Sequence, residues 1–127
     1  AVGLTWTAEA TAPVGLGGVL HVMQSEAPAT VTGTGADLNS PLASTTTGLV
    51  AHLHVTAMTG GDTHTFKLQD ATTLGGVYAD ITAGAFVNVT AVGSQRLVVP
   101  GTIRNFVKLV AVISGHAATY GCAAART

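Results

Sequence analysis

The stretch "AHLHVTAMTGGDTHTF", Ala51 to Phe66, has the pattern of two β-strands joined by a tight turn. Apolar and polar side chains alternate before and after Thr59-Gly60-Gly61-Asp62, a run of residues that favours turns. We expect a β-hairpin in which Met58 pairs with Thr63 and the pairing continues outward from that point. In this register one face is apolar and the other is polar, as a half-buried sheet requires.

The expected hairpin assigns the side chains of both strands to its two faces. The apolar pairs are Ala57 with His64, Val55 with Phe66, and Leu53 with Leu68. The polar pairs are Thr56 with Thr65, His54 with Lys67, and His52 with Gln69. We interpret His52, His54, Lys67 and Gln69, together with Trp6, as possible interface residues. If this polar row contacts another subunit, protonation of His54 beside Lys67 is expected to weaken assembly at mildly acidic pH.

The histidines of this stretch also raise the question of a metal site. Three of the five histidines lie here, and His-x-His with a third histidine nearby is a possible ligand set. The hairpin places His52 and His54 on the polar face and His64 on the core face, so they cannot meet at one ion. Lys67 would also repel a divalent cation. We therefore expect no metal site and no cofactor.

Short strands are indicated along the rest of the chain as well. Gly or Pro interrupts a sequence dominated by Thr, Val, Ala and Gly roughly every eight to twelve residues. Strands are expected at 49–58, 64–70, 77–82, 86–91, 96–99, 103–114 and 117–125. "FVKLVAVIS", Phe106 to Ser114, is apolar at both parities, which indicates a central strand covered on both faces. The sequence predicts an all-β fold, a two-sheet antiparallel β-sandwich of jelly-roll or Ig-like type.

The N-terminal part of the chain has a different organisation. Val2 to Ala10 alternates apolar and polar residues, as a half-buried strand does, and Gly18 to Met23 is a second strand candidate. Gln24 to Gly48 is rich in Ser, Thr and Gly, and its beginning is interpreted as a linker. We expect a boundary near residue 28, with N-terminal strands or an arm over 1–28 and the β-sandwich domain over 29–127.

The composition argues against several classes of function. Of the 127 residues 47% are hydrophobic and 9% are charged, compared with roughly 25% charged in typical soluble domains. The five Lys and Arg residues are scattered and the net charge is -1, so nothing indicates a nucleic-acid surface. The longest apolar run, Leu109 to Ile113, is too short to span a membrane. Cys122 is expected to be a buried, unreactive side chain.

No motif indicates catalysis. The serines lie outside any Gly-x-Ser-x-Gly elbow and the six acidic residues are scattered, so we do not expect an enzyme. Trp6, Tyr78 and Tyr120 are candidates for stacking on a sugar, which makes a carbohydrate-binding jelly-roll module the alternative function. Such a site requires at least two aromatic faces exposed on one concave surface.

From about Thr30 to Arg126 the chain resembles a β-rich domain of structural proteins from tailed bacteriophages of actinobacteria. The resemblance is carried by "LVAHLHVTAMTGGDTHTFKLQDATT", "VYADITAGAFVNVTAVGSQRLVVPGTIRNFVKLVAVISG" and "YGCAAAR". Its most characteristic part is "SQRLVVPGTIRNFVKLV", Ser94 to Val110, in which a strand and a Pro-Gly turn precede a long central strand. The first 28 residues are similar to the end of the tail-tube-like domain that often precedes this module. Because a complete tube domain does not fit into 28 residues, the chain is either truncated or uses its N-terminal strands as an arm on a neighbouring subunit.

The resemblance implies a structural role in the virion, assembled in the host cytoplasm. It implies either a tail-tube-associated subunit or a decoration protein of capsid or tail. The implied partners are other copies of the chain and neighbouring virion proteins. In the alternative function, surface carbohydrate is a possible partner. We expect neither nucleic acid nor a membrane as a partner. The low charge agrees with this role, because neighbours cover much of each surface in a repeated assembly.

Overall fold

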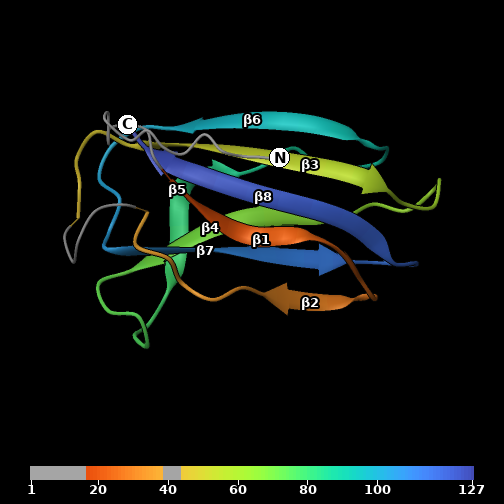
Figure 1. Cartoon of the computed structure of the whole chain (residues 1–127), viewed down its shortest axis with the longest axis horizontal. Coiled ribbons are helices and arrows are strands. Elements are labelled where there is room, and N and C mark those ends of the chain that lie inside the picture. The colour runs from red at the N-terminus through yellow and green to blue at the C-terminus, as the bar shows by residue number, and fades with distance from the viewer. Residues whose placement is uncertain (1–16, 39–43) are drawn as a thin grey trace.

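The computed structural model describes residues 17–38 and 44–127, which form an all-β structure (Figure 1). The strands are β1 Gly17–Glu26, β2 Ala29–Thr32, β3 Leu49–Ala57, β4 Thr65–Ala71, β5 Ala79–Ala85, β6 Gly93–Val99, β7 Phe106–Ile113 and β8 Ala118–Arg126. Over these described ranges there is no helix of a length and apolar character that could cross a membrane.

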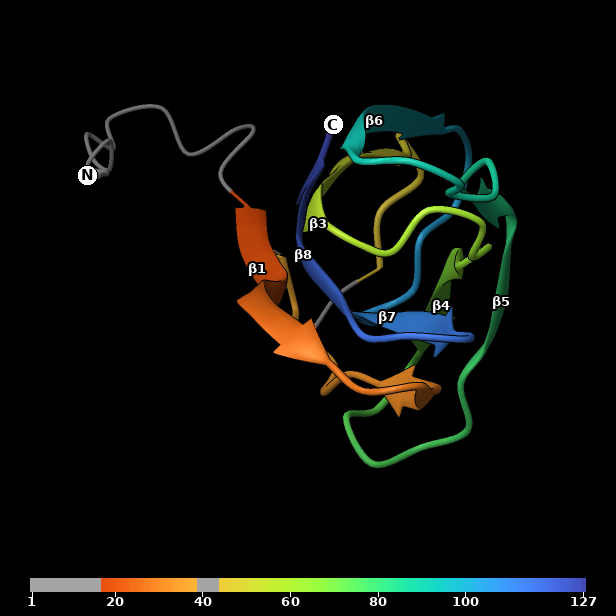
Figure 2. The ribbon, with the colours of Figure 1, turned by 90° about the vertical axis from the view of Figure 1, so that its right-hand side faces the viewer.

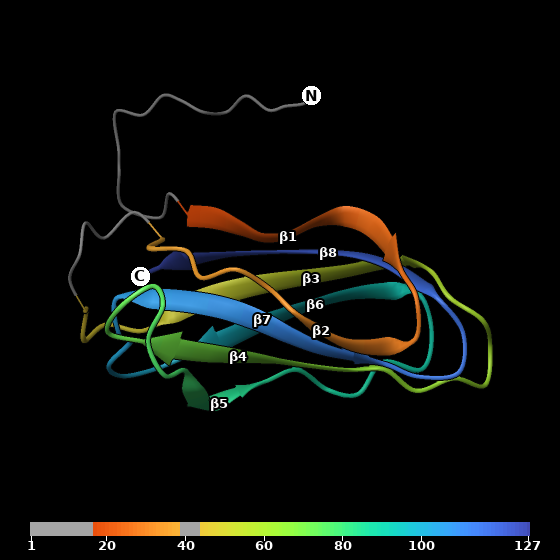
Figure 3. The same cartoon turned by 90° about the horizontal axis from the view of Figure 1, so that it is seen from below.

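The strands form two antiparallel sheets that pack face to face (Figures 2 and 3). Sheet A has the order β1-β8-β3-β6, and sheet B has the order β2-β7-β4-β5. The chain crosses between the sheets at every connection except the one between β4 and β5. This order is that of an eight-stranded jelly roll. The predicted all-β, two-sheet sandwich is thus confirmed, and strand order distinguishes the jelly roll from the Ig-like type.

The core lies between the two sheets and follows the period-two alternation of the sequence. In β3 the side chains of Ala51, Leu53 and Val55 are buried while His52 and His54 are exposed. In β4, Phe66 and Leu68 are buried in the same core. The predicted assignment of these residues to inner and outer faces is therefore confirmed.

The hairpin predicted from the same stretch is wrong. β3 pairs with β6 and β8 in sheet A, whereas β4 pairs with β5 and β7 in sheet B. Thr59-Gly60-Gly61-Asp62 does form a turn, but the chain then crosses to the other sheet instead of folding back beside β3. Alternation fixes which face of a strand is buried and is the same whichever strand lies alongside, so it could not reveal this crossing.

The strand β7 was predicted to be central and covered on both faces. It lies between β2 and β4, so the central position is confirmed. On its outer side Val110 is 8% exposed, but Val112 is 41% exposed, so the outer covering is only partial.

Among the described residues, the chain on both sides of residue 28 belongs to the same sandwich. β1 pairs with β8 along its length, and Leu20 lies in the core, so residues 17–26 belong to the sandwich. The predicted linker contains β2, which pairs with β7. The strand predicted over Val2 to Ala10 lies outside the described residues.

Candidate interaction surface

Four of the predicted interface residues were expected on one polar face of the hairpin. The structure places them on opposite faces of the sandwich, His52 and His54 on one and Lys67 and Gln69 on the other. His52 and His54 lie on the outer face of sheet A, opposite Arg96 and Ser94 of β6. Nδ1 of His54 is within hydrogen-bond distance, 2.8 Å, of the hydroxyl of Ser94. The predicted pairing of His54 with Lys67 is wrong, so the pH effect expected from that pair has no structural basis.

Lys67 and Gln69 lie on the outer face of sheet B, where both contact Asp80 of β5. Nζ of Lys67 is 3.1 Å from Asp80, and the amide of Gln69 donates a hydrogen bond of 2.8 Å to it. The bond from Gln69 and then that from Lys67 hold the pKa of Asp80 below its usual value. These groups thus satisfy one another on their own sheet. Trp6, the fifth predicted interface residue, lies outside the described residues.

The three histidines of the opening stretch do not converge. His64 is completely buried, as predicted, and its Nδ1 accepts a hydrogen bond from the backbone N–H of Ser114 at 3.1 Å. His52 and His54 project from the opposite side of sheet A, away from the core.

Of the four edge strands in the two sheets, β6 has the most regular pairing with its neighbour. It pairs with β3 over seven residues without a shift in register. The other edges are interrupted or short: β1 has two register shifts, β5 has one, and β2 has four residues. Within 17–38 and 44–127, no backbone hydrogen bond joins the other side of β6 to a further segment. Unpaired N–H and C=O groups of a regular edge are a template for another strand.

Exposed valines surround this edge. Val87 is 77% exposed, Val92 is 57% exposed and Val98 is 54% exposed. Residues 81–95 contain no charged side chain. We call β6 and the preceding residues 86–92 the β6 flank. Sequence reasoning missed this surface, although the long run without charge was a signal that it could have used.

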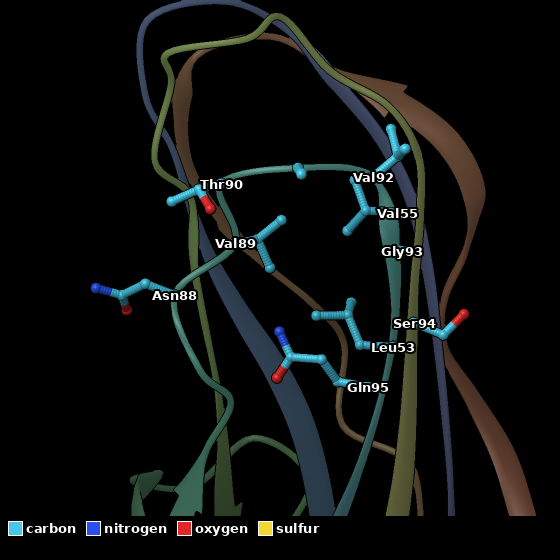
Figure 4. Close-up of a pocket in the computed structure, with 10 residues that line it drawn as sticks. Leu53, Val55, Asn88, Val89, Thr90, Val92, Gly93, Ser94 and Gln95 are labelled. Atoms are coloured by element: carbon cyan, nitrogen blue, oxygen red, sulfur yellow. The ribbon is translucent and has the colours of Figure 1, made fainter.

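A pocket of about 230 Å³ opens in the β6 flank (Figure 4). Residues 88–95 bend around it, and the side chains of Val89 and Gln95 point into it. Leu53 and Val55 of β3 add apolar surface from the core side. The remaining lining residues are Asn88, Thr90, Ala91, Val92, Gly93 and Ser94. The lining has no ionisable side chain, so the pocket suits an uncharged group and provides no acid, base or metal ligand.

Two sets of hydrogen bonds hold the pocket wall in place. The side chain of Gln95 accepts a bond from the backbone N–H of Val87 at 3.0 Å and donates one to its carbonyl at 2.8 Å. The backbone of Val89 exchanges two hydrogen bonds with that of His64. Residues 86–91 were predicted to be a strand, but in backbone pairing they form only this isolated bridge and a hydrogen bond from the N–H of Phe86 to the carbonyl of Phe66. The pocket is therefore built before any ligand arrives.

Tyr78 and Tyr120, the two sugar-stacking candidates among the described residues, do not form an exposed aromatic pair. Tyr120 is completely buried, with its ring stacked on the imidazole of His21 at 4.1 Å. Tyr78 is half-buried, and Nζ of Lys108 lies 4.0 Å from its ring centroid. Trp6 lies outside the described residues.

Cys122 is buried, as predicted, and is a free thiol. Burial raises the pKa of this thiol to about 12. Because the thiolate is the reactive form, Cys122 is unreactive in the folded protein.

Comparison with protein-family models and with curated proteins found no match to this chain.

Proposed function

We propose that this chain is a bacteriophage virion structural protein, a tail-tube-associated subunit or a decoration subunit of capsid or tail. It acts by packing against other copies of itself and against neighbouring virion proteins, and it has no catalytic role. The observation that carries the proposal is the β6 flank, a regular strand edge that has no further strand beside it among the described residues and has exposed valines on or near it.

An edge of this kind is a liability for a protein that works alone. Natural sheets usually protect their edges with bulges, short strands or charged residues, and β6 has only one charged residue, Arg96. Val87, Val92 and Val98 are exposed on or beside this strand, and exposed apolar side chains at a strand edge favour contact with a partner. The low charge of the whole chain, 9%, fits a protein whose surface is covered by neighbours.

The resemblance to phage structural proteins supports the same proposal. Its most characteristic segment, Ser94 to Val110, includes most of β6 and the first five residues of β7. The open edge therefore belongs to the part of the chain in which the resemblance is most specific.

The carbohydrate-binding alternative depends on exposed aromatic faces. Tyr120 is buried and Tyr78 has a lysine over its ring. The described residues therefore favour contact with proteins over contact with sugars.

Two measurements test the proposal: whether the purified chain associates with itself, and whether phage particles contain it. Analytical ultracentrifugation and negative-stain imaging of the purified chain, from micromolar to millimolar concentration, should show ordered association that increases with concentration. Mass spectrometry of phage particles purified from the host that carries the gene should detect its peptides. A chain that stays monomeric throughout and is missing from such particles would overturn the proposal.

A further inference from the structure

We infer that the β6 edge of one copy binds the N-terminal segment of a second copy, Val2 to Ala10, as an additional strand of sheet A. This inference rests on the proposed function and names the contact through which copies associate. It joins three independent observations: an open edge, a preformed pocket beneath that edge, and an alternating segment that precedes β1.

The open edge determines where a strand can be added. A strand beside β6 satisfies the N–H and C=O groups that point away from β3, those of every second residue of β6, and this is the source of affinity in strand addition. The edges of β1 and β5 are less suitable because their register shifts break the regular spacing of these groups. β2 is too short to hold a segment of this length.

The pocket determines which side chains the new strand should carry. In β6 the side chains of Gln95 and Leu97 point to the inner side of sheet A, whereas Ser94, Arg96 and Val98 point outward. A strand added at this edge directs every second side chain to the same inner side, where the uncharged pocket opens. An apolar side chain fits there, because the pocket walls include Leu53, Val55 and Val89.

The N-terminal segment has the matching pattern. Its apolar side chains are those of Val2, Leu4, Trp6, Ala8 and Ala10. The alternate positions hold Gly3, Thr5, Thr7 and Glu9, which would lie on the outer side with Arg96. Arg96 forms no ion pair with an acidic side chain in the described part of the chain, so Glu9 provides a complementary charge. One face thus matches the pocket and the other matches the outer surface.

Topology favours a second copy as the source of the strand. The segment joins the sandwich at Gly17, the start of β1, and β1 and β6 are the opposite edges of sheet A (Figure 2). To reach β6 of its own copy it would have to cross the outer face of β8 and β3, whereas a neighbouring copy can present its β6 edge without such a crossing. The sixteen residues before Gly17 can extend roughly 50 Å, far enough to reach a neighbour.

Addition of the N-terminal segment of one copy to the β6 edge of the next joins copies head to tail. Each copy offers a donor segment at one edge of sheet A and an acceptor at the other, so the contact is heterologous and leads to rings or filaments. A symmetric contact between two β6 edges would instead stop at a dimer.

The test uses one donor variant, one acceptor variant and a matched control in the full-length chain. Trp6→Glu places a charge in the donor's apolar row. Val92→Glu places one at the rim of the pocket, where the side chain is already 57% exposed, so folding should be preserved. Val112→Glu makes the same change on sheet B, at a side chain that is 41% exposed.

We expect Trp6→Glu and Val92→Glu each to abolish association in ultracentrifugation, and Val112→Glu to associate as the unmodified chain does. Mixing the two defective variants should restore one-to-one dimers, because one retains a working acceptor and the other a working donor. Failure of the mixture to form dimers, with both variants folded, overturns the proposed strand addition between copies. Loss of association in Val92→Glu alone would indicate a contact between two β6 edges.

A peptide of residues 1–12 tests the contact directly. With a fluorescent label it should bind the Trp6→Glu chain, whose acceptor is free, and hydrogen exchange of the β6 amides should slow when it binds. Val92→Glu should weaken peptide binding by roughly tenfold or more, while Val112→Glu should leave it unchanged. A peptide that binds without protecting β6 overturns the assignment of the edge. If the unmodified chain associates and none of these variants affects it, this inference fails and the proposed virion role stands.

Discussion

Tyr120 has a hydroxyl group that is buried with no hydrogen-bond partner among the described residues. Its ring packs between the imidazole of His21 and the ring of Phe66, with centroid distances of 4.1 Å and 4.9 Å. A buried polar group without a partner costs about 1–3 kcal/mol of desolvation. We expect Tyr120→Phe to leave the free energy of unfolding unchanged or to raise it by about 1 kcal/mol in urea denaturation.

The matched control removes the ring as well as the hydroxyl. Tyr120→Ala should lower the free energy of unfolding by about 3–5 kcal/mol, because it leaves a cavity between the two sheets. If Tyr120→Phe were itself destabilising by more than about 1 kcal/mol, the hydroxyl would have to contribute a hydrogen bond in the folded protein.

At the scale of single residues, the sequence predicts burial well and partners poorly. The exposed His52 and His54 and the buried His64 follow from alternation alone, because successive side chains of a strand point to opposite faces. The neighbour of His54 is Ser94 of β6 and not Lys67. Ser94 lies forty residues further along the chain. No local pattern contains that information.

At the scale of elements, β1 has a hydrogen-bonded carboxylate that should respond to acid. The carboxylate of Glu26 accepts a hydrogen bond from the side chain of Gln24 at 2.8 Å and lies 2.7 Å from Nε2 of His21. These contacts, that with Gln24 first, hold the pKa of Glu26 below its usual value of 4.5. A group whose pKa is lower in the folded state stabilises that state above its unfolded pKa, and the contribution is lost as pH falls through the folded value.

We therefore expect the pairing of the edge strand β1 with β8 to become less stable as pH falls below 4.5. Hydrogen exchange of the β1 amides, corrected for the intrinsic effect of pH, should become faster relative to that of the β7 amides. Glu26→Gln should remove most of this difference. Equal pH dependence in the variant and the unmodified chain would assign the effect to other groups.

The strands were easier to predict than their order. Six of the predicted segments contain or overlap β1, β3, β4, β5, β7 and β8, and 96–99 lies within β6. β2 was missed because its four residues lie in a segment rich in Ser, Thr and Gly, where composition favours a linker. The β6 flank was not predicted either. A strand is at an edge when no strand pairs with one of its sides, and the alternation of apolar and polar residues does not reveal which strands pair.

At the scale of the whole molecule, one side chain ties distant segments together. The guanidinium of Arg126 in β8 donates hydrogen bonds to the carbonyls of Ile103, Arg104 and Asn105, between β6 and β7. It also donates to the carbonyl of Asp37 and to the hydroxyl of Thr45, between β2 and β3. Arg126 is only 6% exposed, so these bonds hold a buried cation in place.

We expect Arg126→Lys to lower the free energy of unfolding by about 3 kcal/mol, because an ammonium group cannot reproduce the planar fork of donors. The matched control is Arg96→Lys on the exposed outer face of sheet A, which should change stability by less than about 0.5 kcal/mol. Urea denaturation of both variants measures the difference. Similar values for the two would mean that the buried hydrogen bonds contribute little.

The position of β8 in sheet A has a consequence for how the protein is made. This strand lies between β1 and β3, so it holds the sheet together, yet it is the last of the eight strands to leave the ribosome. Until it emerges, β1 has no partner and β3 has only β6. Folding of the sandwich must therefore wait until β8 has left the ribosome, and its many long-range pairings should make it slow, on the order of milliseconds to seconds. During that interval the nascent chain exposes unpaired strands, and a chaperone that binds extended apolar segments would find them available.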